Sequence, residues 1–143
     1  MAGAGALRST TCDMLAFIAA NLGNTAGSLE KVLQECHTVY AEIPPPHGLR
    51  GFIARWCKRR RSHVKPPVHM ALGWLVSLVA PSGHKVYWHN GATGGYRAFV
   101  GFVKESSTGI VVLSNKGLSQ YGLSFRVLPV EEIGFHLLQF LNL

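Results

Sequence analysis

The feature that most constrains the fold is a series of short apolar segments, rich in β-branched and aromatic residues, in the second half of the chain. Turn residues separate these segments, as in Pro81-Ser82-Gly83-His84. This pattern is typical of strands joined by tight turns, and strands joined in this way run antiparallel. We predict four strands, at residues 70–79, 85–89, 96–103 and 109–114.

Two segments before the strands have the spacing of helices. In residues 9–22 the apolar side chains recur every three or four positions, with Thr10 or Thr11 as the N-cap and Gly23 as the stop. A second helix is predicted to begin at an N-cap Ser28. It must end at the prolines 44–46, because proline has no N–H to donate to the helix.

A third helix is predicted to open at Pro129. Glu131 and Glu132 suit the positive N-terminal end of its dipole. The predicted apolar face of this helix consists of Ile133, Leu137, Leu138 and Leu141. Helices, an antiparallel sheet and a closing helix predict an α+β fold, with the N-terminal helices and the C-terminal helix packed on the sheet.

The segment 41–67 follows neither pattern. At 143 residues the chain is expected to be one domain or part of one, and this segment is predicted to be a proline-rich, basic loop or insertion within it. Seven of the fourteen lysines and arginines lie between Arg50 and Lys65. The run at 58–61 has a second interpretation, a patch for nucleic acid or an anionic membrane. The rest of the chain is close to neutral, so nucleic acid is not the expected partner.

The cysteines indicate neither a disulfide framework nor a metal site. Cys12, Cys36 and Cys57 cannot all pair with one another and form no Cys-x-x-Cys spacing. A zinc site made of Cys57, His63 and His69 fits no standard ligand spacing. We therefore expect no metal and no cofactor. The sequence also predicts no transmembrane helix and no signal peptide.

The run 88–96, Trp-His-Asn-Gly-Ala-Thr-Gly-Gly-Tyr, is the most informative stretch for function. Its glycines and small residues let the backbone pass close to something else. One interpretation is a glycine-rich turn between two strands. A phosphate cradle is less favoured, because no helix N-terminus or P-loop lysine follows. The third interpretation is an edge strand that lines the cleft of a serine hydrolase.

Four runs together carry a resemblance to a known family. They are Ala-Leu-Gly-Trp at 71–74, the run 88–96, Val-Val-Leu-Ser-Asn at 111–115, and Ala-Leu-Arg-Ser-Thr at 6–10 followed by Asp13 and an apolar helix. The chain resembles the C-terminal half of the class C β-lactamase and penicillin-binding-protein superfamily, including its esterase branch. The likeness covers nearly all of the chain except 41–67, and it implies a partial β-lactamase/transpeptidase-like fold.

The resemblance also implies roles for the residues of the run 88–96. The family has a Lys-Thr-Gly or His-x-Gly box on the strand beside its catalytic serine, and His89, Asn90 and Gly91 match it. The family pattern gives the amide of Ala92 to the oxyanion. Thr93, Gly94 and Tyr96 would shape the wall of the cleft. A histidine at the first box position is closer to the esterase and peptidase members than to true cephalosporinases.

The family reaction also needs a serine activated by a lysine three residues later, and a Tyr-x-Asn or Ser-x-Asn box. No serine or tyrosine of this chain is followed two residues later by asparagine. Ser-x-x-Lys occurs three times, at Ser28, Ser62 and Ser82, but each lies downstream of the place that the family gives to its nucleophile. We expect a C-terminal portion that lacks its nucleophile and is inactive alone.

The parent, by resemblance, would hydrolyse an acyl ester, a β-lactam or a D-amino-acid peptide through an acyl-serine, and would often be periplasmic or secreted. Two alternatives stay open. One is a non-catalytic interaction module that uses the basic segment between Arg50 and Lys65. The other is a half-domain that complements an N-terminal half supplied in trans.

Overall fold

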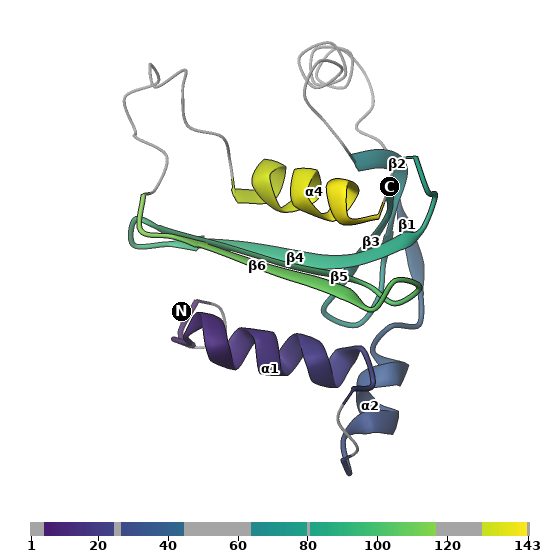
Figure 1. Ribbon diagram of the computed structural model, residues 1–143, viewed down its shortest axis with the longest axis horizontal. Helices are drawn as coiled ribbons and strands as arrows, with labels where there is room; N and C mark the ends of the chain where they lie inside the picture. Colours follow the sequence, from purple (N-terminus) through teal and green to yellow (C-terminus); the bar gives the residue numbers. More distant parts are fainter. Residues whose placement is uncertain (1–4, 25–26, 45–63, 80, 117–129, 143) are drawn as a thin grey trace.

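The structure is a computed structural model that describes residues 5–24, 27–44, 64–79, 81–116 and 130–142. A six-stranded antiparallel sheet lies between helices (Figure 1). The strands follow one another in the sheet in the order of the chain. They are β1 (Ala41–Ile43), β2 (Val64–Met70), β3 (Leu75–Val79), β4 (Lys85–Thr93), β5 (Tyr96–Val103) and β6 (Thr108–Ser114).

Helices cover both faces of this sheet. Helix α4 (Val130–Leu141) packs on one face, and helix α1 (Thr11–Asn21), with α2 (Glu30–Glu35) at its end, lies on the other (Figure 1). This arrangement confirms the predicted α+β class, with the N-terminal helices and the C-terminal helix packed on an antiparallel sheet. No described helix is long and apolar enough to cross a membrane.

Helix α1 begins and ends as its sequence predicts. Thr10 is the N-cap, and its hydroxyl accepts from the amide of Asp13 while the Asp13 carboxylate accepts from Thr10, which forms a capping box. At the other end Gly23 has a φ of +80°. The amides of Gly23 and Asn24 donate to the carbonyls of Ala20 and Ala19, the paired bonds of a Schellman motif.

Helix α2 differs from its prediction. It spans six residues, its N-cap is Leu29 rather than Ser28, and no side chain caps it. It ends early because the chain joins the sheet, where the amide of Tyr40 donates to the carbonyl of Met70. The predicted helix up to the prolines was therefore wrong, since sheet pairing replaces the last helical turns.

The predicted strand 70–79 is two strands, β2 and β3. Gly73, with a φ of +75°, lies in the turn between them, and the amide of Ala71 donates to the carbonyl of Trp74. Strand β2 begins at Val64, so the predicted loop 41–67 has strands at both of its ends. The register of β2 against β3 shifts between Lys65 and His69, where two prolines supply no N–H to the ladder. Residues 45–63, with most of the basic run, lie outside the described residues.

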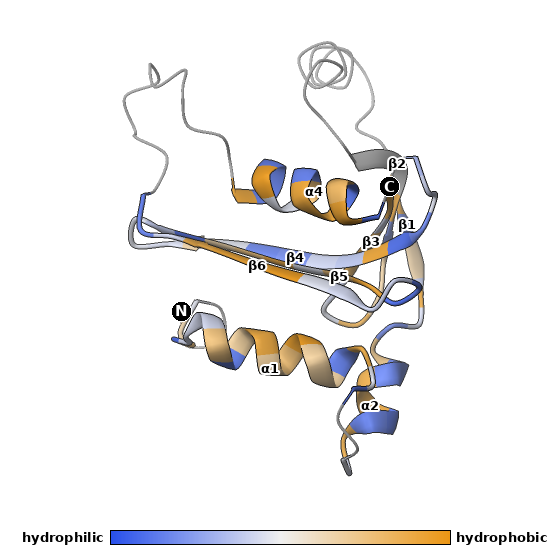
Figure 2. Cartoon of the chain, in the orientation of Figure 1, coloured by the Kyte–Doolittle hydropathy of each residue, from blue (hydrophilic) through white to orange (hydrophobic). Residues whose placement is uncertain are grey.

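Alternation along the strands builds two cores, one on each face. The core under α4 contains Val79, Val86, Phe99, Val103, Val130, Phe135 and Leu138. The core under α1 contains Ile18, Ala71, Trp74, Val76, Tyr87 and Phe102. Figure 2 shows that α4 turns hydrophobic residues toward the sheet. The two cores make the sheet the shared middle layer of the domain.

Helix α4 is rotated from its predicted orientation. Of the predicted face only Leu138 is buried, whereas Leu137 and Leu141 are 42% and 53% exposed. The buried residues are Val130, Gly134, Phe135 and Leu138. Gly134 lies against the ring of Phe99, so the absence of a side chain there lets the helix approach the sheet.

The close approach of Gly134 to Phe99 predicts that adding one methyl group at position 134 destabilises the fold. A Cβ at Gly134 overlaps the ring of Phe99, which is 1% exposed and held in the core. Overpacking costs about 1–3 kcal/mol, and the helix propensity gained from alanine returns at most about 1 kcal/mol. Gly134→Ala should therefore lower the free energy of unfolding by about 1–2 kcal/mol in urea titrations. Gly91→Ala is the matched control, because no described atom lies within 4 Å of a Cβ built there. Equal stability of the two variants would contradict this packing.

Candidate functional site

The glycine-rich run 88–96 forms the end of the β4–β5 hairpin. The two strands pair from Val86 opposite Val103 to Thr93 opposite Tyr96. Gly94 and Gly95 form a two-residue turn with φ values of +53° and +86°. Positive φ at both central positions is the requirement of a type I′ hairpin turn, which glycine meets without steric cost. These two glycines are therefore explained by the turn.

The first half of the run lies where the sheet becomes narrower. Strand β3 pairs with β4 only from Leu78 opposite Lys85 to Leu75 opposite Trp88. Beyond Trp88, β4 continues for five residues, and no described strand pairs with that side of it. His89, Asn90, Gly91 and Ala92 thus lie on a stretch of open strand edge, next to the hairpin turn.

The side chains of this open stretch alternate between the two faces. Val86 belongs to the core under α4 and Tyr87 to the core under α1, so Asn90 and Ala92 face the α4 side. By the same alternation His89, Gly91 and Thr93 face the α1 side. All five are exposed, as are Gly94 and Tyr96. The structure therefore brings the predicted site residues together on one accessible strand end.

Gly5, in the segment that leads into α1, lies beside this strand end. A Cβ built at Gly5 would come within 3.5 Å of the Thr93 hydroxyl oxygen. At Gly91 the situation is different, because no described atom lies within 4 Å of a Cβ built there. The packing of the described chain therefore does not require glycine at position 91.

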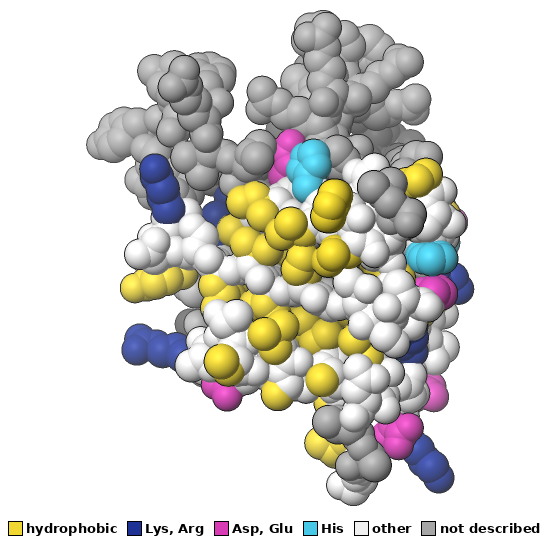
Figure 3. All heavy atoms as spheres, viewed as in Figure 1, with side chains coloured by type: hydrophobic (Ala, Val, Ile, Leu, Met, Phe, Trp, Pro, Cys, Tyr) yellow, Lys and Arg dark blue, Asp and Glu magenta, His cyan; other side chains and the backbone are white. Residues whose placement is uncertain are grey.

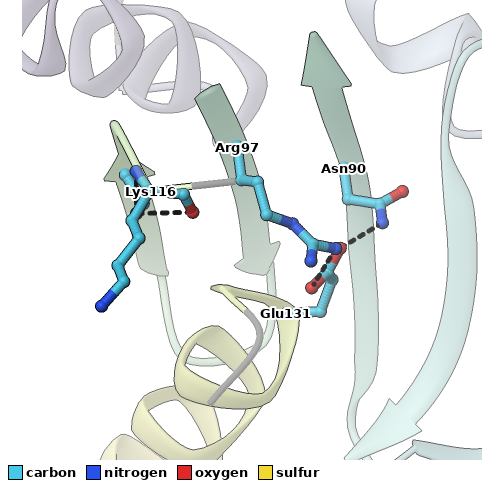
Figure 4. A network of polar contacts seen from close by, with 5 residues as sticks. Asn90, Arg97, Lys116 and Glu131 are labelled. Carbon is cyan, nitrogen blue, oxygen red and sulfur yellow. Dashed lines mark hydrogen bonds and ion pairs between the residues drawn. The ribbon is translucent and has the colours of Figure 1, made fainter. Parts of the chain in front are cut away.

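A polar network joins the open stretch to α4 (Figure 4). The Asn90 amide nitrogen donates to Glu131 Oε1 at 2.6 Å, and Arg97 Nη2 donates to the same oxygen at 3.0 Å. The three residues come from β4, β5 and the first turn of α4 (Figure 4). Arg97 and Glu131 side chains are 16% and 19% exposed. A carboxylate only accepts hydrogen bonds, so the amide nitrogen of Asn90 must face it and the amide oxygen points away.

Sequence reasoning identified Asn90 but missed both of its partners. Glu131 was interpreted only as a favourable charge at the helix N-terminus, and Arg97 was not singled out. The one available signal was an arginine just after the hairpin turn, on the face that alternation gives to the α4 side.

The network determines the charge of Glu131. Burial raises the pKa of its carboxyl, but the hydrogen bond from Asn90, a backbone hydrogen bond and the Arg97 charge together hold that pKa below the usual value of 4.5. A depressed pKa means that the folded state stabilises the ionised form. That stabilisation is complete above pH 4.5 and is lost as the pH falls through the folded-state value.

Glu131→Gln should therefore lower the free energy of unfolding at pH 7 by about 1–2 kcal/mol, since hydrogen bonds to a charged group are lost. At pH 3 and below, where protonation weakens the wild-type network as well, the two proteins should approach equal stability. The matched control is Glu132→Gln, one residue along the same turn, which should change stability by less than about 0.5 kcal/mol. Urea titrations at both pH values measure this, and equal effects of the two variants would contradict the assigned role of Glu131.

Two of the three Ser-x-x-Lys serines lie within the described residues, and neither is placed beside the open stretch. Ser28 is exposed before α2, and Ser82 is exposed in the β3–β4 turn, where its hydroxyl accepts from the amide of His84. That turn and the site turn lie at opposite ends of β4, roughly 25 Å apart at strand rise. Ser62 lies outside the described residues.

A separate polar pair, which is buried, lies on the α1 side of the sheet. His37 is 5% exposed, and its Nε2 is 2.9 Å from the side-chain oxygen of Asn21, which is also buried. The rings of Tyr87 and Phe102 lie 5.0 and 5.2 Å from the His37 ring. Burial, and then the charge of Lys104, lower the pKa of His37 from 6.5 to about 4.

This pair predicts acid sensitivity in a defined window. Between pH 6.5 and about 4 the unfolded chain binds a proton at His37 and the folded chain does not, so stability falls as the pH falls through that range. The expected loss is about 3 kcal/mol. His37→Gln, which keeps a donor for Asn21, should abolish that part of the slope. His89→Gln, at an exposed histidine, should leave it in place. Thermal melts from pH 7 to pH 4 measure the slope, and an unchanged slope in His37→Gln would disprove the assignment.

No group of three or more histidine, cysteine, aspartate or glutamate side chains is placed to hold a metal within the described ranges. Of the zinc ligands considered from the sequence, Cys57 and His63 lie outside those ranges, and His69 lies in β2. Cys12 and Cys36 are free thiols.

Comparison with known families gives the family of this α+β domain. The family model described as Beta-lactamase matches residues 1–124. The chain belongs to the beta-lactamase family. A comparison with curated proteins finds no match.

Proposed function

We propose that this chain, taken as one partial domain over residues 1–143, supplies the substrate-holding wall of a beta-lactamase-family serine hydrolase. The full-length protein cleaves an ester or an amide through an acyl-serine, and these residues form its C-terminal portion. The observation that carries the proposal is the step in the sheet at Trp88, beyond which β4 continues with an open edge. A strand edge of this kind offers backbone donors and acceptors to an extended substrate.

Each residue of the open stretch has a role in this proposal. His89 supplies a polar group that holds the substrate and tunes nearby proton transfers. Gly91 lets an acyl group lie against the strand, which is supported by the absence of any described atom within 4 Å of a Cβ there. The amide of Ala92 donates to the oxyanion, a contact of about 3–4 kcal/mol in related chemistry. Thr93, Gly94 and Tyr96 form the wall at the hairpin end.

Asn90 acts as an oriented acceptor. Its amide nitrogen is bound by Glu131, and its oxygen points away from that carboxylate (Figure 4). An acceptor fixed in this way suits a substrate N–H next to the acyl carbonyl, as in an amide or an acylated amino acid. Glu131 and Arg97 are positioning residues, since they act on the substrate only through Asn90.

The nucleophile of the proposed reaction is a serine outside this chain. Ser28 and Ser82, as described, are not placed beside the open stretch, and catalysis needs a serine within hydrogen-bond reach of its base. The purified 143-residue chain should therefore hydrolyse neither a chromogenic cephalosporin nor a short-chain nitrophenyl ester above background. Hydrolysis that Ser28→Ala abolishes would refute this part of the proposal.

The proposed substrate-holding wall is tested by measuring ligand binding rather than turnover. Titration of the isotope-labelled chain with the same ester or cephalosporin should shift amide NMR signals mainly in residues 89–93. Gly91→Val should weaken those shifts at least about tenfold, because its side chain fills the space given to the acyl group. Its melting temperature should stay within about 2 °C, since the described chain leaves that space empty. Leu29→Val, at an exposed leucine just before α2, is the control. Shifts centred elsewhere, or insensitive to Gly91→Val, would refute the wall.

A further inference from the structure

The side chain of His37 connects both N-terminal helices to the sheet. It lies just after α2, and its Nε2 is 2.9 Å from the side-chain oxygen of Asn21, the last residue of α1. The ring packs in the core under α1, with its centroid 6.4, 5.0 and 5.2 Å from those of Trp74, Tyr87 and Phe102. His37 and Asn21 are both buried, so α1, α2 and the sheet meet at this pair.

The hydrogen bonds of Asn21 determine which nitrogen of His37 takes up a proton in acid. A carbonyl only accepts, so the group 2.8 Å from the Phe17 carbonyl is the Asn21 amide nitrogen, and the amide oxygen faces His37. In the neutral ring Nε2 therefore carries the hydrogen, and a second proton must bind Nδ1. Nδ1 is buried and has no hydrogen-bond partner among the described residues. Protonation thus creates a charged ring with an unpaired N–H in the interior, which is strongly unfavourable.

The charged groups around His37 oppose a positive charge on it. Lys104, which follows β5, is the cation that acts on His37, and its ammonium lies 5.3 Å from the centre of the Tyr87 ring. A protonated His37 would place a second cation against the same ring. The carboxylates nearby do not offset this, because Glu35 accepts from a tyrosine hydroxyl and Glu105 is exposed in the turn after β5. The other side chains of the core under α1 are uncharged.

The contact of His37 with Asn21 is a large part of what holds α1 and α2 on the sheet. The buried residues of α1 are Ile18 and Asn21, and α2 has none. One hydrogen bond, from Lys104 Nζ to Gln34 Oε1 at 2.6 Å, also joins α2 to the sheet. In Figure 3 hydrophobic side chains gather over α1 and between α1 and the sheet, so this boundary is mainly apolar. A charge there is unfavourable, and elements held by few buried side chains open first.

We propose that His37 and Asn21 form an acid-sensitive latch. Uptake of a solvent proton at Nδ1 of His37 releases α1 and α2 from the sheet, while the sheet and α4 stay folded. The segment that leads into α1 lies beside the open stretch, since a Cβ at Gly5 would come within 3.5 Å of the Thr93 hydroxyl oxygen. The release therefore also frees one border of that stretch. The latch consists of buried groups, whose burial additional chain on the outside of the domain could only increase, and it does not depend on the proposed function.

Hydrogen exchange of the 143-residue chain, followed by NMR at pH 7.5 and pH 5.0, tests the latch. Protection factors of the α1 and α2 amides should be lower than those of β4 and β5 at both pH values, because the helices open separately. They should fall roughly 25-fold from pH 7.5 to pH 5.0, since the pKa of His37 is 6.5 in the open state and about 4 in the closed state. Equal protection of the helices and of β4 and β5 would show that only global unfolding occurs and would overturn the proposal.

A variant without the titrating group separates the latch from other effects of acid. His37→Gln keeps a donor for Asn21 but takes up no proton in this range. Its protection factors in α1 and α2 should differ by less than about twofold between the two pH values. His69→Gln, at a partly buried histidine of β2, is the matched control and should retain the full fall. A fall that persists in His37→Gln would rule out the latch.

A disulfide between α1 and β6 tests the released state without changing His37. A Cβ built at Gly109 lies 3.5 Å from the Cβ of Ile18, at the short end of the range for a disulfide. Ile18→Cys with Gly109→Cys, with serine in place of Cys12, Cys36 and Cys57, should form this bond on oxidation. The protection of α1 should then rise to that of β5, and reduction should lower it again. Low protection of α1 in the oxidised protein would contradict separation of this helix from the sheet.

Discussion

The pairing of β4 with β5 is the constraint on which the rest of this structure depends. Along β5, Phe99 points to one face and Phe102 to the other, and both are almost completely buried. Each ring anchors one core, so the two helical layers are coupled through a single strand. The same ladder fixes the register of the open stretch on β4. A slip of one residue would exchange the faces of every side chain and would separate Asn90 from Glu131.

Much of the fold is predictable from local signals in the sequence. The elements that were predicted wrongly have a common cause. The strand at 96–103 and the capping of α1 follow from alternation and from Thr10 and Gly23, because these signals act over a few residues. The division of residues 70–79 into two strands depends on Gly73, whose positive φ turns the chain back within an apolar run. The orientation of α4 depends on Gly134 meeting Phe99, a contact between residues 35 positions apart in the sequence. Tertiary contacts of that kind leave no local pattern.

The candidate site, like the fold, has a part that local sequence signals predict and a part that depends on tertiary contacts. That His89, Asn90 and Gly91 lie together on one strand follows from their being consecutive in an extended segment, and their role in catalysis stays a proposal. The support of this stretch was not predictable, since Glu131 reaches Asn90 from a helix 41 positions later in the sequence. Membership of the beta-lactamase family agrees with the resemblance carried by the runs at 71–74, 88–96 and 111–115. Family membership alone assigns no activity to a chain, because function depends on the groups assembled at the site.

The narrowing of the sheet at Trp88 has a mechanical consequence. Among the described strands, only β5 pairs with β4 from His89 to Thr93, whereas both β3 and β5 pair with it before that. A strand that is paired along one side only is least constrained at its free end, which here is the hairpin turn after Thr93. Glu131 bonds to Asn90, the second residue of this stretch, so it ties the strand to α4 and shortens the part that is free to move. Through this carboxylate, helix α4 limits the movement of the end of β4.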